Sequence, residues 1–285
     1  MDIIPEINHK TRYPCKMEIY PYLRDHYFEG KAILPAVEAL IIMANAVKLK
    51  FPQTQITCLL RARFSRFLLI APETNRQAIS VDIENSVEGS IAAVLLTSTK
   101  SKKGAISRTL EHAHVEFGKA DLSSRAMPPF RAVEKLEGQC ISIPSATIYR
   151  ELVPFGKAYQ NIVGDLSVSP AGALAYLSGG NYEADENLLG SPFVLDAAMH
   201  AACVWGQRFT DIVPFPVGFE KRVIYQKTKK EGSYLGRIVP VDVKKEPLIF
   251  DIWIYDLNGA ICEIITGMQM RDVTQGRLRP PQWIK

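Results

Sequence analysis

The first half of the chain combines one helical pattern with several strand-like runs. From residue 35 onward, apolar residues recur at helical spacing and others spread around the same segment, which is typical of a helix wrapped by a sheet. The main apolar face consists of Val37, Leu40, Ile41, Ala44 and Val47. The pattern predicts a central helix that Pro52 ends. It also predicts one strand before the helix, over residues 11–21, and four after it, over residues 55–71, 77–85, 90–99 and 106–117.

The second half repeats this order without repeating the sequence. Ser191 can accept hydrogen bonds from the free amides of a first helical turn, and Pro192 suits the first helical position, so a helix is predicted from residue 191 to about 208. Strand-like runs lie on both sides of it, over residues 162–169, 173–178, 213–226, 233–240, 248–255 and 260–271. The chain therefore looks like two copies of one motif.

The stretch between the halves reads as a linker. Apolar density falls over residues 118–145, Pro128 and Pro129 interrupt any regular pattern, and only residues 132–136 fit a short helix. We therefore expect an N-terminal unit over residues 1–117, a linker over 118–145 and a C-terminal unit over 146–285.

Composition places the chain among globular proteins. It has 285 residues, of which 47% are hydrophobic and 22% charged, and this balance excludes a disordered chain. The longest apolar stretch, residues 32–47, is interrupted by Pro35, Glu38 and Asn45, so no membrane helix is predicted. The first residues show neither a basic start nor an apolar core of a signal peptide, and we expect a cytoplasmic protein.

Charge and cysteine spacing exclude several classes of function. The net charge of +4 is small and dispersed, which argues against nucleic acid and would suit an acidic protein partner. The five cysteines are at least 43 residues apart, so no CxxC zinc, redox or iron–sulfur spacing occurs. Neither GxGxxG nor GxxxxGK[ST] is present, which removes nucleotide-binding enzymes of those types.

His26 is the first candidate for chemistry. It lies at the end of a predicted strand, nine residues before the first predicted helix. The free backbone amides at the start of that helix, around Ala36, carry partial positive charge that could polarise a carbonyl group while the imidazole acts on the adjacent carbon. A structural or incidental role is the alternative, and for an isolated histidine it is the commoner one.

Asp196 and His200 form the second candidate. Their spacing of four residues puts the carboxyl group and the imidazole on one face of the second predicted helix. The neighbouring residues are apolar, and burial in such surroundings raises the pKa of a carboxyl group, which makes it a proton donor. Alternatively, Asp196 only interacts with the helix dipole and His200 is an ordinary partner one turn later.

Two further groups are considered as binding sites. His112 and His114 share one face of a predicted strand, a spacing that can hold a metal ion, but no third ligand is evident and a solvated strand face is favoured. Arg61, Arg63 and Arg66 lie in or beside a strand and could meet an acidic carrier protein or a phosphate group, although a surface strand face is again the simpler interpretation.

Three motifs together resemble a known family. His26-xxx-Gly30-xxxx-Pro35, followed much later by Leu195-Asp196-xxx-His200, resembles the two signature motifs of the dehydratase domains of polyketide and fatty acid synthases. Between them, residues 149–162 are similar to the third family motif, usually written around Tyr-Gly-Pro-x-Phe-Gln, and residues 215–220 are similar to the first strand after the second helix. The motifs follow the family order and spacing over nearly the whole chain.

The resemblance implies a fold and a reaction. The fold would be α+β, a double hot-dog in which each of two tandem units is a curved antiparallel sheet around a central helix. The reaction would remove water from a β-hydroxyacyl thioester on an acyl carrier protein, in polyketide or specialised lipid biosynthesis. His26 would take the α-proton, with a pKa near the ordinary ~6.5 and hence a rate that falls as the pH drops through that value. Asp196 would protonate the departing hydroxyl, and His200 would orient Asp196.

The resemblance also implies binding residues and partners. Ala36 and Gly156 are expected to offer backbone amides to the thioester carbonyl. The residues expected to bind substrate are Gly30, Leu34, Pro35, Ala36, Phe155, Gly156 and Tyr159. No metal or organic cofactor is expected, because the substrate arrives on the phosphopantetheine arm of the carrier protein. A homodimer and contacts with other synthase components are further expectations.

The chain departs from the family pattern in the third motif. Phe155 replaces the family's tyrosine, Lys157 its proline and Tyr159 its phenylalanine, and Ala36 stands where many members have glycine. A product-template-like cyclase or another hot-dog enzyme acting on acyl thioesters is an alternative activity. A non-catalytic module that binds the carrier protein is the alternative from another class.

Overall fold

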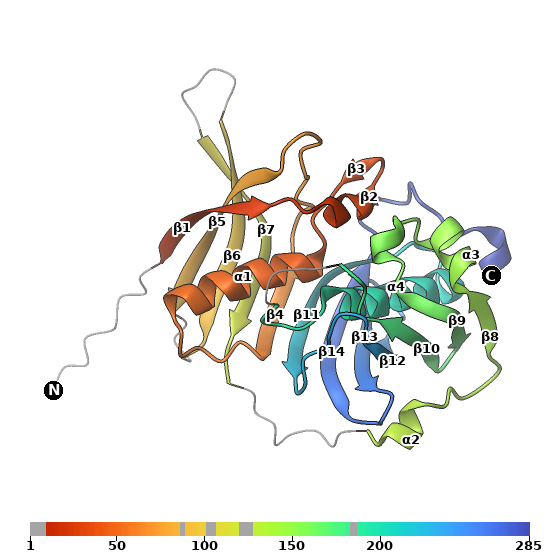
Figure 1. The fold of residues 1–285 in the computed structure, drawn as a ribbon. Helices are drawn as coiled ribbons and strands as arrows, with labels where there is room; N and C mark the ends of the chain where they lie inside the picture. Colours follow the sequence, from red (N-terminus) through yellow and green to blue (C-terminus); the bar gives the residue numbers. More distant parts are fainter. Residues whose placement is uncertain (1–9, 86–88, 101–106, 120–127, 183–186) are drawn as a thin grey trace.

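The computed structural model describes residues 10–85, 89–100, 107–119, 128–182 and 187–285. In the first half a single long helix is embedded among short and long strands (Figure 1). The elements are β1 (Thr11–Glu18), β2 (Tyr27–Phe28), β3 (Lys31–Ala32), α1 (Ala36–Lys50), β4 (Cys58–Phe64), β5 (Arg76–Asn85), β6 (Ile91–Lys100) and β7 (Ser107–Phe117).

The second half again contains one long helix, with shorter helical segments before it. The elements are α2 (Phe130–Val133), β8 (Ile141–Pro144), α3 (Ser145–Thr147), β9 (Ile162–Ser169), β10 (Gly172–Ser178), α4 (Pro192–Phe209), β11 (Phe215–Ile224), β12 (Ser233–Asp242), β13 (Leu248–Asp256) and β14 (Ile261–Arg271). A π-helical turn (Ile148–Leu152) and a 3₁₀ turn (Lys157–Tyr159) lie between α3 and β9.

Strands of both halves join one antiparallel sheet. Among the described residues it has twelve strands in the order β1-β5-β6-β7-β4-β11-β14-β13-β12-β10-β9-β8. The seam between the halves is the β4–β11 pair, where Ala62 lies opposite Phe219. The separate hairpin β2–β3 stands apart from this sheet and precedes α1 directly. The sheet therefore continues from one half into the other.

The two long helices line up along this sheet. α1 packs against β5, β6 and β7, while α4 packs against β9, β10, β12 and β13, and the two helices also contact each other (Figure 1). One hydrophobic core runs through both halves and includes Phe117 and Leu40 from the first and Phe193 and Phe250 from the second, all fully buried. This continuous core fixes how the two helix starts sit relative to each other.

Several predicted boundaries differ from the structure. The predicted strand over 55–71 is β4 only as far as Phe64, because the backbone amides of Ser65 and Arg66 both turn to the carbonyl oxygen of His112. The predicted strand over 11–21 ends at Glu18, and a 3₁₀ turn follows at Pro21–Asp25. The expected linker over 118–145 contains β8, which pairs with β9 along the sheet edge, and the short helix lies at Phe130–Val133 rather than over 132–136.

None of the helices formed by the described residues is long and apolar enough to cross a membrane.

Candidate active site

A short hairpin holds His26. The turn between β2 and β3 contains Glu29 and Gly30, whose φ angles of 49° and 73° are in the left-handed region that favours glycine. Beside the hairpin, Ile33 N–H donates to the backbone oxygen of His26 at 2.9 Å, and His26 Nδ1 lies 3.1 Å from the Ile33 oxygen. The four-residue spacing from His26 to Gly30 is therefore the spacing that this turn requires.

The hydrogen bond to Ile33 determines which ring nitrogen of His26 is basic. A carbonyl oxygen only accepts hydrogen bonds, so Nδ1 carries the ring hydrogen and Nε2 keeps the lone pair that can take a proton. Burial lowers the pKa of His26 to about 4, an effect that the nearby charge of Asp196 opposes and that of His200 reinforces. The imidazole is thus neutral at pH 7.

Asp196 and His200 face each other on α4. Both are buried, each with 5% of its surface exposed, and Asp196 Oδ2 lies 3.0 Å from His200 Nε2. The contact lacks the geometry of a hydrogen bond, and neither atom has a hydrogen-bond partner among the groups that the structure describes. α4 begins at Pro192 because the side chain of Ser191 accepts a hydrogen bond from Phe193 N–H, as the sequence predicts.

Phe155 connects the two candidates across the molecule. Its ring stacks on His26 with centroids 4.2 Å apart and lies 5.0 Å from the ring of His200. His26 and Asp196, 170 positions apart in the sequence, line the same cavity of about 880 Å³. We call this space the central cavity. The structure thus brings the two sequence candidates together.

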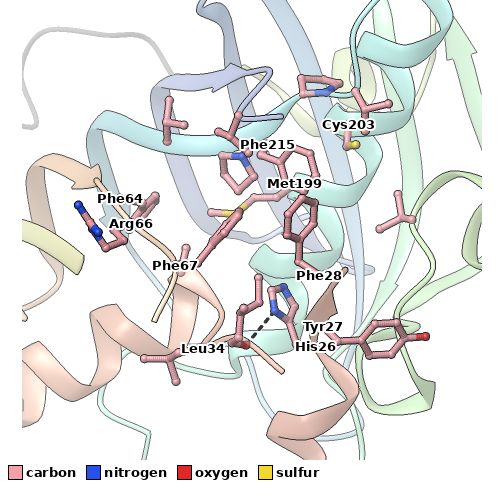
Figure 2. A pocket seen from close by; sticks show the side chains of 18 of the residues that line it. His26, Tyr27, Phe28, Leu34, Phe64, Arg66, Phe67, Met199, Cys203 and Phe215 are labelled. Carbon is pink, nitrogen blue, oxygen red and sulfur yellow. Dashed lines mark hydrogen bonds between the residues drawn. The ribbon is translucent and has the colours of Figure 1, made fainter. Parts of the chain in front are cut away.

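The wall of the central cavity is mostly apolar and comes from both halves of the chain. Phe28, Phe67 and Phe215 supply a cluster of aromatic rings with centroids 5.2 to 6.2 Å apart (Figure 2). Met199 and Cys203 of α4 extend the wall one and two turns beyond Asp196. Such a wall suits an apolar ligand, and the volume is in the range of small-molecule sites.

The first turn of α1 opens onto the central cavity. Pro35 precedes the helix in an extended conformation, and no side chain among the described residues caps this end. Ala36, the first helical residue, lines the cavity, and no described group accepts a hydrogen bond from its backbone N–H. A carbonyl oxygen in the cavity could therefore use this amide, where the helix dipole also favours negative charge.

The expected substrate-binding residues divide into two groups. Gly30, Leu34, Ala36 and Phe155 line the central cavity, whereas Pro35, Gly156 and Tyr159 do not. Pro35 sets the start of α1 instead. Tyr159 is fully buried and packs edge-on against His26, with ring centroids 5.1 Å apart.

The expected role of the Gly156 amide is wrong. Its N–H already donates to the backbone oxygen of Asp25 at 2.8 Å, and Ala158 N–H donates to Asp25 Oδ2 at 2.9 Å. A Cβ atom on Gly156 would lie 2.4 Å from Cγ of Asp25, so only glycine permits this approach. These two amides of the third motif therefore hold Asp25, the residue just before His26. Their role is to position the imidazole and not the substrate.

Of the two histidines on β7, His114 is partly exposed, whereas His112 does not lie on the solvated face that was expected. His112 is buried and lines the central cavity. Its Nδ1 donates to the Arg66 oxygen at 3.3 Å, and its Nε2 lies 2.8 Å from Thr97 Oγ1. Within the described ranges no group of three potential metal ligands occurs. Of the three arginines, Arg66 lines the cavity, while Arg61 forms an ion pair with Glu116.

Sequence reasoning assigned no role to two buried polar residues near the site. Tyr149 contacts His200, and Glu38 accepts a hydrogen bond from the Tyr22 hydroxyl at 3.2 Å. Burial raises the pKa of Glu38 to about 7. The hydrogen bond from Tyr22 lowers this pKa, and the nearby charge of Asp196 raises it further. A carboxyl group on the apolar face of the first helix was the available signal for Glu38.

Comparisons with known proteins bear on the family and the fold. A sequence model described as "Polyketide synthase dehydratase N-terminal domain" matches residues 132–280, which include Asp196 and His200 but not His26. A search of curated proteins finds no match.

Solved structures of similar fold cover nearly the whole chain. The dehydratase domain from the CurF module of curacin polyketide synthase has a TM-score of 0.70 at 19% identity, with 94% of this chain and 95% of that chain covered. A trans-AT polyketide synthase dehydratase domain from Brevibacillus brevis has a TM-score of 0.70 at 18% identity, covering 93% and 94%. The dehydratase domain of RzxB from Pseudomonas fluorescens has a TM-score of 0.68 at 13% identity, covering 93% and 97%. With more than half of its residues matched by the family model, this chain belongs to the polyketide synthase dehydratase family.

Proposed function

We propose that this protein removes water from a β-hydroxyacyl thioester carried on an acyl carrier protein and forms the α,β-enoyl thioester. The observation that carries the proposal is a neutral imidazole and a buried carboxyl group on the wall of one apolar cavity. Removal of water from this substrate needs one group to take a proton from the α-carbon and another to protonate the leaving hydroxyl. His26 and Asp196 are of the right types for these two tasks.

The reaction involves two proton transfers, one from the α-carbon of the substrate to the protein and one from the protein to the leaving hydroxyl group. Nε2 of His26 takes the α-proton, and the electron pair of that C–H bond forms the new double bond. Asp196 gives a proton to the β-hydroxyl group, whose C–O bond breaks as water leaves. The backbone N–H of Ala36 donates to the thioester oxygen and stabilises the negative charge that develops there. The thioester itself acidifies the α-carbon, so no metal or organic cofactor is proposed.

Related proteins support the choice of these two residues. Among the structures similar in fold are two variants of the dehydratase domain from the CurK module of curacin polyketide synthase, each described as inactive. One replaces a histidine with phenylalanine and the other an aspartate with asparagine. These are the residue types that we assign to base and acid here.

The test follows the mass of a β-hydroxyacyl carrier protein on incubation with the purified protein. Loss of one water is expected for the wild type. His26→Phe and Asp196→Asn should each lower turnover by ~10²–10⁴-fold while the protein stays folded. His114→Phe and Asp211→Asn serve as matched controls, because both residues lie outside the central cavity, and they should retain the wild-type rate.

Other outcomes of this assay would point to other functions. Ring formation from a poly-β-keto chain, without loss of water from the hydroxyacyl carrier, would indicate a product-template-like cyclase. Binding of the carrier protein without any turnover, equally strong in His26→Phe, would indicate a non-catalytic module. Besides the carrier protein, we propose a homodimer that works with other synthase components in the cytoplasm.

A further inference from the structure

Tyr149 is a buried tyrosine that contacts His200, the neighbour of Asp196 in the central cavity. It belongs to the π-helical turn Ile148–Leu152, and its side chain is buried against α4. Its hydroxyl oxygen accepts a hydrogen bond from Ile162 N–H at 2.9 Å and lies 3.5 Å from Nδ1 of His200. The two rings meet edge to face, with centroids 5.8 Å apart. Tyr149 does not line the cavity, so it can affect the reaction only indirectly, and His200 is the candidate residue that its hydroxyl contacts.

The hydroxyl hydrogen of Tyr149 has one nearby acceptor, Nδ1 of His200. The backbone amides of Ile162 and Asn161 both favour the oxygen as an acceptor, yet burial outweighs them and holds the pKa of Tyr149 well above its usual value. The hydroxyl therefore keeps its hydrogen, and with the amides on the oxygen lone pairs that hydrogen points to the nearby Nδ1 of His200. Nδ1 then acts as an acceptor.

The tautomer of His200 follows from this arrangement. A neutral imidazole with an accepting Nδ1 carries its hydrogen on Nε2. Nε2 lies 3.0 Å from Asp196 Oδ2 in a contact that lacks the geometry of a hydrogen bond, and neither atom has a hydrogen-bond partner among the residues described. Oδ2 is therefore the acceptor within reach of the hydrogen on Nε2, and a small adjustment of the two side chains would bring that hydrogen onto it. An oxygen that accepts this hydrogen leaves the transferable proton of Asp196 on Oδ1.

We propose that Tyr149 is a positioning residue that fixes His200 as the Nε2–H tautomer, so that Asp196 presents a protonated Oδ1 to the substrate hydroxyl. This inference rests on the proposed dehydratase function. Without the Tyr149 hydroxyl, His200 can carry its hydrogen on Nδ1 instead. Nε2 then draws the proton of Asp196 onto Oδ2, away from the substrate.

The test compares Tyr149→Phe with a matched control, Tyr234→Phe. Tyr234 is also a buried tyrosine whose hydroxyl accepts a backbone amide, that of Lys229 at 2.6 Å, but it lies on β12 and does not line the central cavity. Both variants lose an acceptor for a backbone amide and should lose similar stability. Only Tyr149→Phe should lower kcat, by ~10–100-fold with little change in KM, as is usual for a group that orients a reacting one.

The tautomer itself is read by ¹⁵N NMR of the imidazole nitrogens at pH 8, with the His200 signals assigned from His200→Gln. Wild-type His200 should show a protonated Nε2 and an unprotonated Nδ1, and Tyr149→Phe should show a mixture or the reverse. A wild-type protein with the hydrogen on Nδ1 overturns the proposal, even if Tyr149→Phe fails to fold. Equal kcat values in Tyr149→Phe and Tyr234→Phe overturn it as well.

A double-mutant cycle separates this inference from the proposed function. If Tyr149 acts through His200, Tyr149→Phe should change kcat by less than about 2-fold in a His200→Gln background, whereas an undiminished effect there contradicts the proposal. A wild-type protein that removes no water from any β-hydroxyacyl carrier contradicts the dehydratase function instead, and the NMR result still decides the tautomer.

Discussion

His26 shows how far the environment of one residue can differ from its ordinary chemistry. The sequence suggested an imidazole with an ordinary pKa and an acid limb near that value in the rate profile. In the structure, Phe155 covers one face of the ring and burial lowers the pKa of His26 to about 4. A more weakly basic imidazole stays neutral in moderately acidic solution, so the active protonation state extends to lower pH.

The pH dependence of the reaction should reflect this shift. We expect the acid limb of kcat/KM to have its midpoint near pH 4, with no loss attributable to His26 between pH 5 and 8. Replacing Phe155 with alanine should admit water and move the midpoint upward, toward the ordinary value of ~6.5. Stopped-flow mixing into buffers of each pH measures the rate before acid unfolding can interfere. A wild-type midpoint near 6.5 would show that the ring is solvated.

At the residue scale, motif spacing selected segments that the structure brings together, but it did not predict all of their contacts. Spacing selected His26, Asp196 and His200, which line one cavity, because it depends on residue type. It could not show that the Gly156 amide was already bound to Asp25, since that contact joins segments about 130 residues apart and depends on the packing of both. Contacts of this kind follow from the fold and have no local signature.

At the scale of elements, the two long helices begin in different ways. The first turn of α4 is closed by Ser191, whose hydroxyl oxygen accepts Phe193 N–H and donates its own hydrogen to the Gly179 oxygen. The first turn of α1 follows Pro35 and has no such cap among the described residues. A cap satisfies free amides and stabilises a helix by about 1 kcal/mol. Its absence at α1 leaves the Ala36 amide available to a ligand.

Replacing Ala36 with proline tests the role of this amide. Proline at the first helical position removes one N–H group without breaking the helix, and Pro35 already has the extended conformation that a residue before proline requires, with φ −60° and ψ 148°. We expect kcat to fall by ~10²–10³-fold, which is typical of the loss of one donor to a developing oxyanion. Assays of Ala36→Pro with the hydroxyacyl carrier measure this loss.

Circular dichroism and the melting temperature provide the fold control for Ala36→Pro. Both should stay close to the wild-type values, because the removed amide has no partner within the described part of the protein. A fully active Ala36→Pro protein would remove this amide from the mechanism. The thioester oxygen would then have to find its donor elsewhere in the cavity.

Helices and strands with a long apolar pattern were predicted correctly. The prediction failed where contacts with a distant strand decide at which residue an element ends or whether it forms. Both long helices and most strands follow from apolar periodicity. β4 ends at Phe64 because the next two backbone amides both donate to the carbonyl oxygen of His112. The sequence of residues 65–71 gives no sign of this contact. β8 has four residues, too few for a clear alternation, and it exists because β9 offers an edge.

At the scale of the whole molecule, the site depends on the joining of the two halves. His26 comes from the hairpin region of the first half, Asp196 comes from α4 of the second, and the sheet is continuous across the β4–β11 pair. The buried residues around the site belong to one core. Ionisable groups placed in that core couple the stability of the whole fold to pH.

Glu38 and His26 should affect stability in opposite directions. Burial raises the pKa of Glu38 to about 7, so between about pH 4.5 and 7 the folded protein holds a proton that the unfolded chain releases. The stability from this group is present below pH 4.5 and is lost as pH rises through 7. For His26, with a folded pKa of about 4, the unfolded chain binds the extra proton between about pH 4 and 6.5. Its contribution therefore rises with pH over that window.

The overlap of these windows makes Glu38→Gln informative. In the wild type the two slopes oppose each other between about pH 4.5 and 6.5. Glutamine can still accept the Tyr22 hydroxyl but cannot titrate, so of these two contributions the variant should retain only the rising one of His26. Relative to the wild type, its free energy of unfolding should increase with pH by up to about 3 kcal/mol by pH 8, measured by urea denaturation at a series of pH values. Glu73→Gln, at an exposed carboxyl group, is the control and should give a curve parallel to the wild type. A parallel curve for Glu38→Gln as well would mean that Glu38 is ionised in the folded protein, and that water or a cation reaches it beside Tyr22, its hydrogen-bond partner among the described residues.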